Sequence, residues 1–238
     1  MGDMDPAPVD VLNDEPHFLS EPEVAQALER MLNEFQRETD RGAVLIAGEM
    51  VSAQLAAEIR ALAPPELRGK RINELLKYPG FLSSFSARCD VALLAGFIDA
   101  SAHRSTVVLR RLRNDAAHST DAFSLAVHRE RLMQMCSLGS GVAASVSEFA
   151  AKSVLDDVVY RLKQRGMTLE NEIGRNPFSS AAEIFEHLSV RPDLMAVLDE
   201  RMPKMELAIG VWLLLGLIVH QGKRRRAERT TGDIDDAN

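Results

Sequence analysis

Three polar side chains near the middle of the chain are of types that suit metal-free cleavage of RNA. The stretch RLRNDAAH places Arg113 beside Asn114, and His118 follows four residues after the asparagine. Imidazole titrates near neutral pH, so His118 is a candidate general base or acid acting on a 2′-hydroxyl or a leaving oxygen. Arg113 is a candidate for stabilising the charge of the transferring phosphate, and Asn114 for orienting either group.

The same three residues also have a structural interpretation. Arg113 can form a salt bridge, Asn114 can cap a helix, and His118 can bond to backbone. Residues five apart on a continuous α-helix point about 140° apart. Arg113 and His118 therefore converge only if the helix ends near Asp115, or if a dimer brings two copies together. The sequence leaves the catalytic and the structural interpretations open.

Four further arginines are candidate binding residues for phosphate. Arg104, Arg110 and Arg111 lie on the same predicted helix as the motif, and Arg88 lies on the helix before it. A guanidinium presents a planar fork that matches two phosphate oxygens. Charged helix faces are more often solvated surface, and the low aromatic content of 5% argues against stacking on single-stranded bases.

No sequence motif indicates a metal or a cofactor. The chain lacks H-E-x-x-H, a Cys-His cluster, a G-x-G-x-x-G loop, a phosphate-binding loop of the Walker type and a G-x-S-x-G turn. We therefore predict neither a metal nor a cofactor. Cys89 and Cys136 are too far apart for a C-x-x-C pair, which favours a reducing compartment and a cytoplasmic location.

The composition is that of a soluble globular protein. The 238 residues are 46% hydrophobic and 26% charged, and a chain of this length can bury a core without disulfides. The formal charge of −7 gives no general attraction to nucleic acid or to anionic membranes. No helix-turn-helix pattern is present, so direct DNA binding has no motif to support it.

Hydrophobic residues at helical spacing predict helices along almost the whole chain and no strands. The fold class we expect is all-α, a helical bundle. Ser180 and Glu183 form a predicted capping box, Thr39 or Asp40 caps the second helix, and Pro64 ends it. The expected helical segments are 20–35, 40–63, 71–76, 83–97, 100–114, 122–137, 142–165, 180–190 and 203–220.

A composition break at residues 138–141 suggests a compact front bundle and a later helical region. The uncharged run of 13 residues at 207–219 is shorter than the roughly 18–20 apolar residues of a membrane span. It predicts a buried or dimerising helix, with a tail anchor as the alternative. The expected organisation is a disordered lead at 1–19, a bundle at 20–138, a helical insertion at 139–202, a closing apolar helix at 203–222 and a disordered charged tail at 223–238.

Three stretches resemble, in order, helices of the mannitol operon repressor family. They read TDRGAVLIAGEMVSAQLAAEI, LLKYPGFLSSFSARCDVALLAGFID and LRRLRNDAAHS. The resemblance covers about residues 35–137, and MELAIGVWLLLGLI resembles the family's final helix less closely. It implies a compact all-helical cytoplasmic protein, a homodimer, that regulates transcription through a protein partner.

The R-N-x-x-x-H pattern is also similar to that of HEPN domains, helical bundles in which an R-x4-6-H motif often marks a metal-independent ribonuclease that works as a dimer. This resemblance implies RNA as a substrate and Arg113, Asn114 and His118 as the site. HEPN domains without nuclease activity also exist. The leading expectation is therefore a regulatory protein that acts on transcription through protein partners, and the alternative is a ribonuclease.

Overall fold

The computed structural model describes residues 22, 26, 31, 34, 35 and 37–235, and this part of the chain is all-α, with no strand. The predicted fold class is confirmed at that level. The elements are α2 (Asp40–Leu62), the 3-10 turn η2 (Pro65–Leu67), α3 (Lys70–Leu76), α4 (Phe85–Leu94), α5 (Ala100–His118), α6 (Arg129–Met135), α7 (Val142–Ile173), α8 (Ala181–Ser189) and α9 (Pro192–Asp235).

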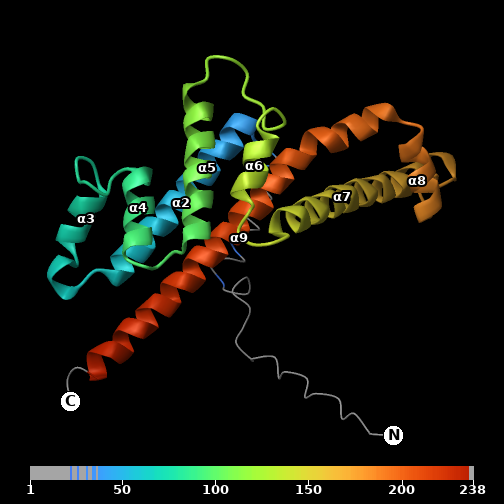
Figure 1. The fold of residues 1–238 in the computed structure, drawn as a ribbon. Coiled ribbons are helices and arrows are strands. Elements are labelled where there is room, and N and C mark those ends of the chain that lie inside the picture. Colours follow the sequence, from blue (N-terminus) through green and yellow to red (C-terminus); the bar gives the residue numbers. More distant parts are fainter. Residues whose placement is uncertain (1–21, 23–25, 27–30, 32–33, 36, 236–238) are drawn as a thin grey trace, which may run out of the picture.

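Helix α2 is the central element of the bundle, and it contacts α4, α5 and α9 (Figure 1). Thr39 caps it by accepting a 3.1 Å hydrogen bond from the backbone N–H of Gly42. It ends one residue before Ala63, because the residue before a proline avoids the helical conformation. Both predicted boundaries of this helix are confirmed.

Helix α5 carries the predicted site, and it continues past Asp115 to His118. The predicted segment 100–114 is therefore four residues too short, and the condition that the helix ends near Asp115 is not met. Leu112 and Ala116 extend its buried face by one more turn, and the carboxylate of Asp115 forms an ion pair with Arg131 of α6. Tertiary packing therefore adds a turn that the sequence pattern did not indicate.

The segment that follows α5 is less helical than its spacing predicts. Only α6 is helical within the predicted 122–137 segment. The backbone N–H of Leu125 donates to the Asp40 carboxylate at 2.8 Å, and Arg41 donates to the carbonyl of Asp121 at 2.6 Å. These bonds to α2 hold residues 121–128 as a loop, since Leu125 is drawn into the core.

Residues 142–201 form an arm that projects from the bundle. Figure 1 shows α7 and the first part of α9 side by side, with α8 at the far end of the arm. Helix α7 passes through Gly166, where we expected a stop, because Gly166 lies against Asn176 and Phe178. Its actual C-cap is Gly174, whose φ of 72° suits glycine.

Helix α9 belongs to both the arm and the bundle. We expected it to start near Pro203 and to end at Gly222, and both expectations are wrong. Leu194, Leu198 and Met202 continue its apolar side at four-residue spacing toward the arm. At the other end, Gly222 contacts the side chain of Glu58, so this glycine permits a close approach and does not end the helix.

The basic stretch after Gly222 is helical to Asp235 and is held on α2, which corrects the expectation of a disordered tail. Arg226 pairs with the buried carboxylate of Glu58, and Arg229 donates to the carbonyl of Leu62 at 3.0 Å. Residues 236–238, the predicted lead at 1–19 and most of the predicted 20–35 helix lie outside the described residues.

In the part of the chain that the structure describes, two helices are long and apolar enough by composition to cross a membrane, namely α2 and the 192–229 stretch of α9. In the folded chain, 56% and 72% of their most apolar windows are buried. Such burial is typical of core helices, so these segments are weak evidence for a membrane span.

Candidate functional site

The structure separates the members of the R-N-x-x-x-H motif. Arg113 and Asn114 line a cavity of about 350 Å³ between α2, α4 and α5, and Arg113 donates to the Asn114 side chain at 3.3 Å. His118 is exposed and does not line this cavity. Because α5 is continuous from Arg113 to His118, the two side chains project about 140° apart. One chain does not bring them together.

Arg88 and Arg110 line the same cavity as Arg113. We call this cavity the arginine pocket and define it by Arg88, Arg110, Arg113, Ser84, Ser86 and Glu49. It is placed by α5, which supplies Arg110 and Arg113 from adjacent turns, and by the start of α4, which supplies the two serines. The sequence predicted Arg88 and Arg110 as binding residues and placed Arg113 on the same helix as Arg110, but it did not indicate that Arg88 lines the same cavity as these two.

A glycine in α2 makes room for one of these arginines. A Cβ atom built on Gly48 would lie 2.8 Å from Cγ of Arg113, closer than ordinary packing allows. Glycine in the middle of a helix is unfavourable by about 1 kcal/mol relative to alanine. At Gly48 the missing side chain lets the aliphatic stem of Arg113 lie against the α2 backbone.

Arg88 is fixed by the backbone around it. Its guanidinium donates to the carbonyls of Leu82 at 2.9 Å, Leu76 at 3.1 Å and Ser52 at 3.2 Å, and to the Ser52 hydroxyl at 2.7 Å. Burial lowers the pKa of Arg88 below its ordinary value. Arg88 therefore joins α2, α4 and the turn after α3, and it adds positive charge to one wall of the pocket.

Among Arg88, Arg110 and Arg113, Arg110 has the fewest hydrogen-bond partners. Its Nε atom is buried, and no described group accepts a hydrogen bond from it. Among the described carboxylates, none lies within ion-pair distance of Arg88, Arg110 or Arg113. Glu49 lines the pocket and raises the pKa of Arg88, without contacting it as an ion pair.

The other two predicted binding residues lie elsewhere. Arg104 and Arg111 line a separate groove of about 490 Å³ on the side of α5 that faces α6, together with Val107 and Val108. The four predicted arginines therefore line two separate cavities on different sides of α5, and one of them, Arg88, comes from α4. They do not form a single phosphate-facing surface.

No protein-family model matches the chain, and no curated protein or solved structure matches it either. The resemblances to the mannitol operon repressor family and to HEPN domains therefore remain predictions.

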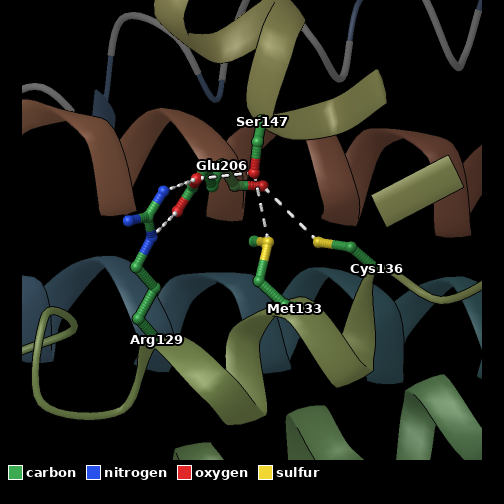
Figure 2. A network of polar contacts seen from close by, with 5 residues as sticks. All are labelled: Arg129, Met133, Cys136, Ser147 and Glu206. Atoms are coloured by element: carbon green, nitrogen blue, oxygen red, sulfur yellow. Dashed lines mark hydrogen bonds and ion pairs between the residues drawn. The ribbon is translucent and has the colours of Figure 1, made fainter. Parts of the chain in front are cut away.

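A buried polar network, which the sequence analysis missed, joins the arm to the bundle (Figure 2). The Glu206 side chain of α9 is 0% exposed. It accepts from Arg129 of α6 at 3.2 Å and 2.7 Å, and from Ser147 of α7 at 2.8 Å. The pair with Glu206 raises the pKa of Arg129. Three helices thus meet on one carboxylate, at the point where the arm leaves the bundle.

The signal for this network was weak in the sequence. Glu206 borders the uncharged run at 207–219, and a single acidic residue next to such a run predicts a solvent-exposed helix position. Its helical position instead places it between Met205 and Leu207, both buried. Only the approach of Arg129, 77 residues away in the chain, reveals why a carboxylate is retained there.

The described residues offer limited chemistry beyond anion binding. They contain no group of three or more His, Cys, Asp or Glu side chains that could hold a metal ion. Burial raises the pKa of Cys89 to about 11 and that of Cys136 to about 12. Neither cysteine is therefore an activated nucleophile at neutral pH.

Proposed function

We propose that this chain is a helical regulatory protein that acts through a protein partner, and that the arm carries the partner-binding surface. The observation behind this proposal is the exposure of large apolar side chains near the end of the arm. Phe185 is 74% exposed, Ile173 67% and Val190 66%. Helix α8 already buries Ile184 and Leu188 on its inner side, so its outer apolar residues add nothing to the arm's own core.

Exposed apolar residues at a partner-binding surface gain free energy when a partner covers them, because apolar area leaves water. The resemblance to the mannitol operon repressor family supports transcription as the process that is regulated. The same proposal includes a cytoplasmic location and a homodimeric state, and it requires no metal and no cofactor.

Site-specific photocrosslinking in the source cell tests the arm as a partner-binding surface. A photoreactive phenylalanine analogue replaces Phe185, and in a matched protein it replaces Leu94, which is 85% exposed on the bundle. We expect a discrete adduct with one partner protein from position 185 only. Adducts from position 94 alone, or from neither position, contradict the proposal.

Transcript measurements test the regulatory part. Deletion of the gene changes the level of a defined set of transcripts, and wild-type protein restores it. We expect the Phe185→Ser variant to accumulate normally and to fail in this restoration, while Leu94→Ser restores the transcripts fully. Unchanged transcripts after deletion overturn a role in transcription.

The ribonuclease alternative now depends on a second copy of the chain. Arg113 and His118 diverge on one helix, so a composite site needs His118 of one copy beside Arg113 of another. Incubation of the protein with single-stranded RNA in EDTA tests this directly. Cleavage that is lost in His118→Ala, and restored when His118→Ala is mixed with Arg113→Ala, supports the dimeric enzyme.

A further inference from the structure

We propose that the arginine pocket binds the phosphate group of a small phosphorylated molecule. This inference goes beyond the proposed function, because it assigns a small-molecule site in the bundle and not on the arm. It rests on the side chains that line one cavity, on their charge and on their missing partners.

The charge of the pocket is unbalanced. Arg88, Arg110 and Arg113 supply three positive charges to its walls, and Glu49 is the one acidic residue among its lining residues. The difference, three minus one, is two positive charges. Like charges along the walls of one cavity repel each other, and an anion bound between them relieves this repulsion. A phosphate monoester carries close to two negative charges near neutral pH, which matches this excess.

The pocket also offers unused hydrogen-bond donors. Arg110 Nε has no acceptor in the described protein. At the first turn of α4, Ser84 caps the helix by accepting from Ala87 N–H at 3.2 Å, whereas the N–H groups of Phe85 and Ser86 have no acceptor among the described residues. Free N–H groups and the positive end of the helix dipole at a helix start both favour an oxyanion.

The arginines of the pocket differ in how many of their donors the protein already uses, and this difference supports an anion-binding site. Arg88 spends its donors on backbone carbonyls and contributes charge. Arg110 and Arg113 are free of ion pairs, and Gly48 provides the space that holds the Arg113 stem beside the pocket. The ligand contacts that we expect are therefore bidentate bonds from Arg110 and Arg113, with the hydroxyl of Ser84 or Ser86 as a further donor.

The size of the pocket favours a small ligand over a nucleic acid. A volume of about 350 Å³ lies at the lower end of the 300–1,000 Å³ that is usual for small-molecule sites. A nucleic acid backbone carries diesters with a single charge per phosphate, and the chain as a whole has a formal charge of −7. We therefore assign a phosphate monoester or free phosphate, which share the same dianionic group.

Titration calorimetry of the full chain at low ionic strength tests the proposal. The probes are inorganic phosphate, methyl phosphate, dimethyl phosphate and acetate. We expect the first two to bind, and dimethyl phosphate and acetate to bind about tenfold more weakly or not at all, because each carries one charge. Tighter binding of methyl phosphate identifies an ester as the ligand, and tighter binding of inorganic phosphate identifies the free ion. Both results support the pocket.

Variants on two sides of α5 provide the matched control. Arg110→Gln and Arg113→Gln should each weaken phosphate binding by about tenfold or more, and Arg110→Lys by less, because lysine keeps the charge and loses the fork. Gly48→Ala should also weaken binding by displacing Arg113. Arg104→Gln lies on the other side of α5 and should bind as the wild type does.

Circular dichroism and thermal unfolding establish that each variant is folded. If Arg110→Gln does not fold, Arg110→Lys replaces it in the binding measurement. Three results overturn the proposal: no binding of either phosphate dianion by the wild type, equal weakening by Arg104→Gln, or stronger binding of dimethyl phosphate or single-stranded RNA than of methyl phosphate. None of these results bears on the arm, so they do not decide the proposed function.

Discussion

The bundle and the arm are built from the same kind of helix but differ in how much they bury. The main core runs from α2 through α4, α5 and α6 to the middle of α9, and it includes the root of α7. The outer part of the arm has a core of three buried side chains, Phe178, Ile184 and Leu188. The arm therefore holds its shape with far less apolar burial than the bundle does.

Helix α9 belongs to both regions, so one helix is tightly packed along part of its length and loosely packed along another part. Within α9, residues 207–211 and 214–215 are almost wholly buried, whereas Met195 and Val197 are more than 40% exposed. Local opening is easiest where few apolar contacts must be broken. We infer that the bundle sets global stability, and that the outer arm opens locally at a lower cost in free energy.

The junction between the two regions should give the largest effect. Arg129→Met leaves the fully buried carboxylate of Glu206 without its cation. Loss of one partner of a buried pair costs about 3–5 kcal/mol. Because the Arg129 side chain is itself about half exposed and water screens the pair, we expect the lower end of this range, about 3 kcal/mol. Denaturant unfolding measures this loss. The double variant Arg129→Met with Glu206→Leu should recover most of it, since no charge is then buried.

Arg131→Met is the control for the junction. Arg131 also lies on α6 and pairs with Asp115, but both side chains are about half exposed. Exposed ion pairs contribute about 0–1 kcal/mol. If Arg131→Met lowers the free energy of unfolding as much as Arg129→Met does, burial of the Glu206 carboxylate does not explain the effect at the junction.

Truncation in the bundle core should lower the stability of the whole protein. Leu109 of α5 is fully buried between α2 and its neighbours, and Leu→Ala at such sites costs about 2–5 kcal/mol through lost burial and the cavity left behind. The midpoints of thermal and of denaturant unfolding should both fall, and every spectroscopic probe should report the same transition. A loss below about 1 kcal/mol contradicts the placement of Leu109 in the main core.

Truncation in the arm should act locally. Ile184→Ala removes one of the three side chains of the small core, so the outer arm should open more often while α2 stays protected. Hydrogen exchange of individual amides separates the two regions. Equal acceleration of exchange in α2 and α8 shows instead that the arm and the bundle unfold as one unit.

The capping box at the start of α8 should give a smaller effect in the same region. Ser180 accepts from the N–H of Glu183 at 3.2 Å, and the Glu183 side chain accepts from the N–H of Ser180 at 3.0 Å. Ser180→Ala should lower the stability of α8 by about 1 kcal/mol, read from amide exchange. Ser189→Ala, at the other end of α8, is the control and should change exchange little.

The two buried cysteines should react least with added reagents at neutral pH. Burial raises the pKa of Cys89 to about 11 and that of Cys136 to about 12, so at pH 8 roughly one Cys89 in a thousand is a thiolate. A thiol reagent should label neither residue in the folded protein and both in denaturant. Rapid labelling of the folded protein contradicts their burial.

The raised pKa values of the two cysteines also make the free energy of unfolding depend on pH. The folded pKa values exceed the ordinary value of 9.0, so the thiols stabilise the fold fully below about pH 9. This contribution is lost as the pH rises through about 11 and 12. The free energy of unfolding of the wild type should therefore fall more steeply above pH 9 than that of Cys89→Ala with Cys136→Ala.

Local sequence determined the class of the fold and several boundaries. Apolar residues at helical spacing require helices, Thr39 and Ser180 cap two of them, and Pro64 follows the end of α2. These features depend on residues within one or two turns of each other, so the chain near them is sufficient. The candidate arginines were also visible, because charge and side-chain type need no partner to be recognised.

Only the tertiary structure decided where several helices stop and which arginines share a site. Gly166 and Gly222 resemble helix ends in sequence, yet they lie inside helices because Asn176 and Glu58 approach them closely. The same contacts across the chain place Arg113 with Arg88 and Arg110, and turn His118 away. Distant segments and burial set these outcomes, and no local pattern encodes the distance between two helices.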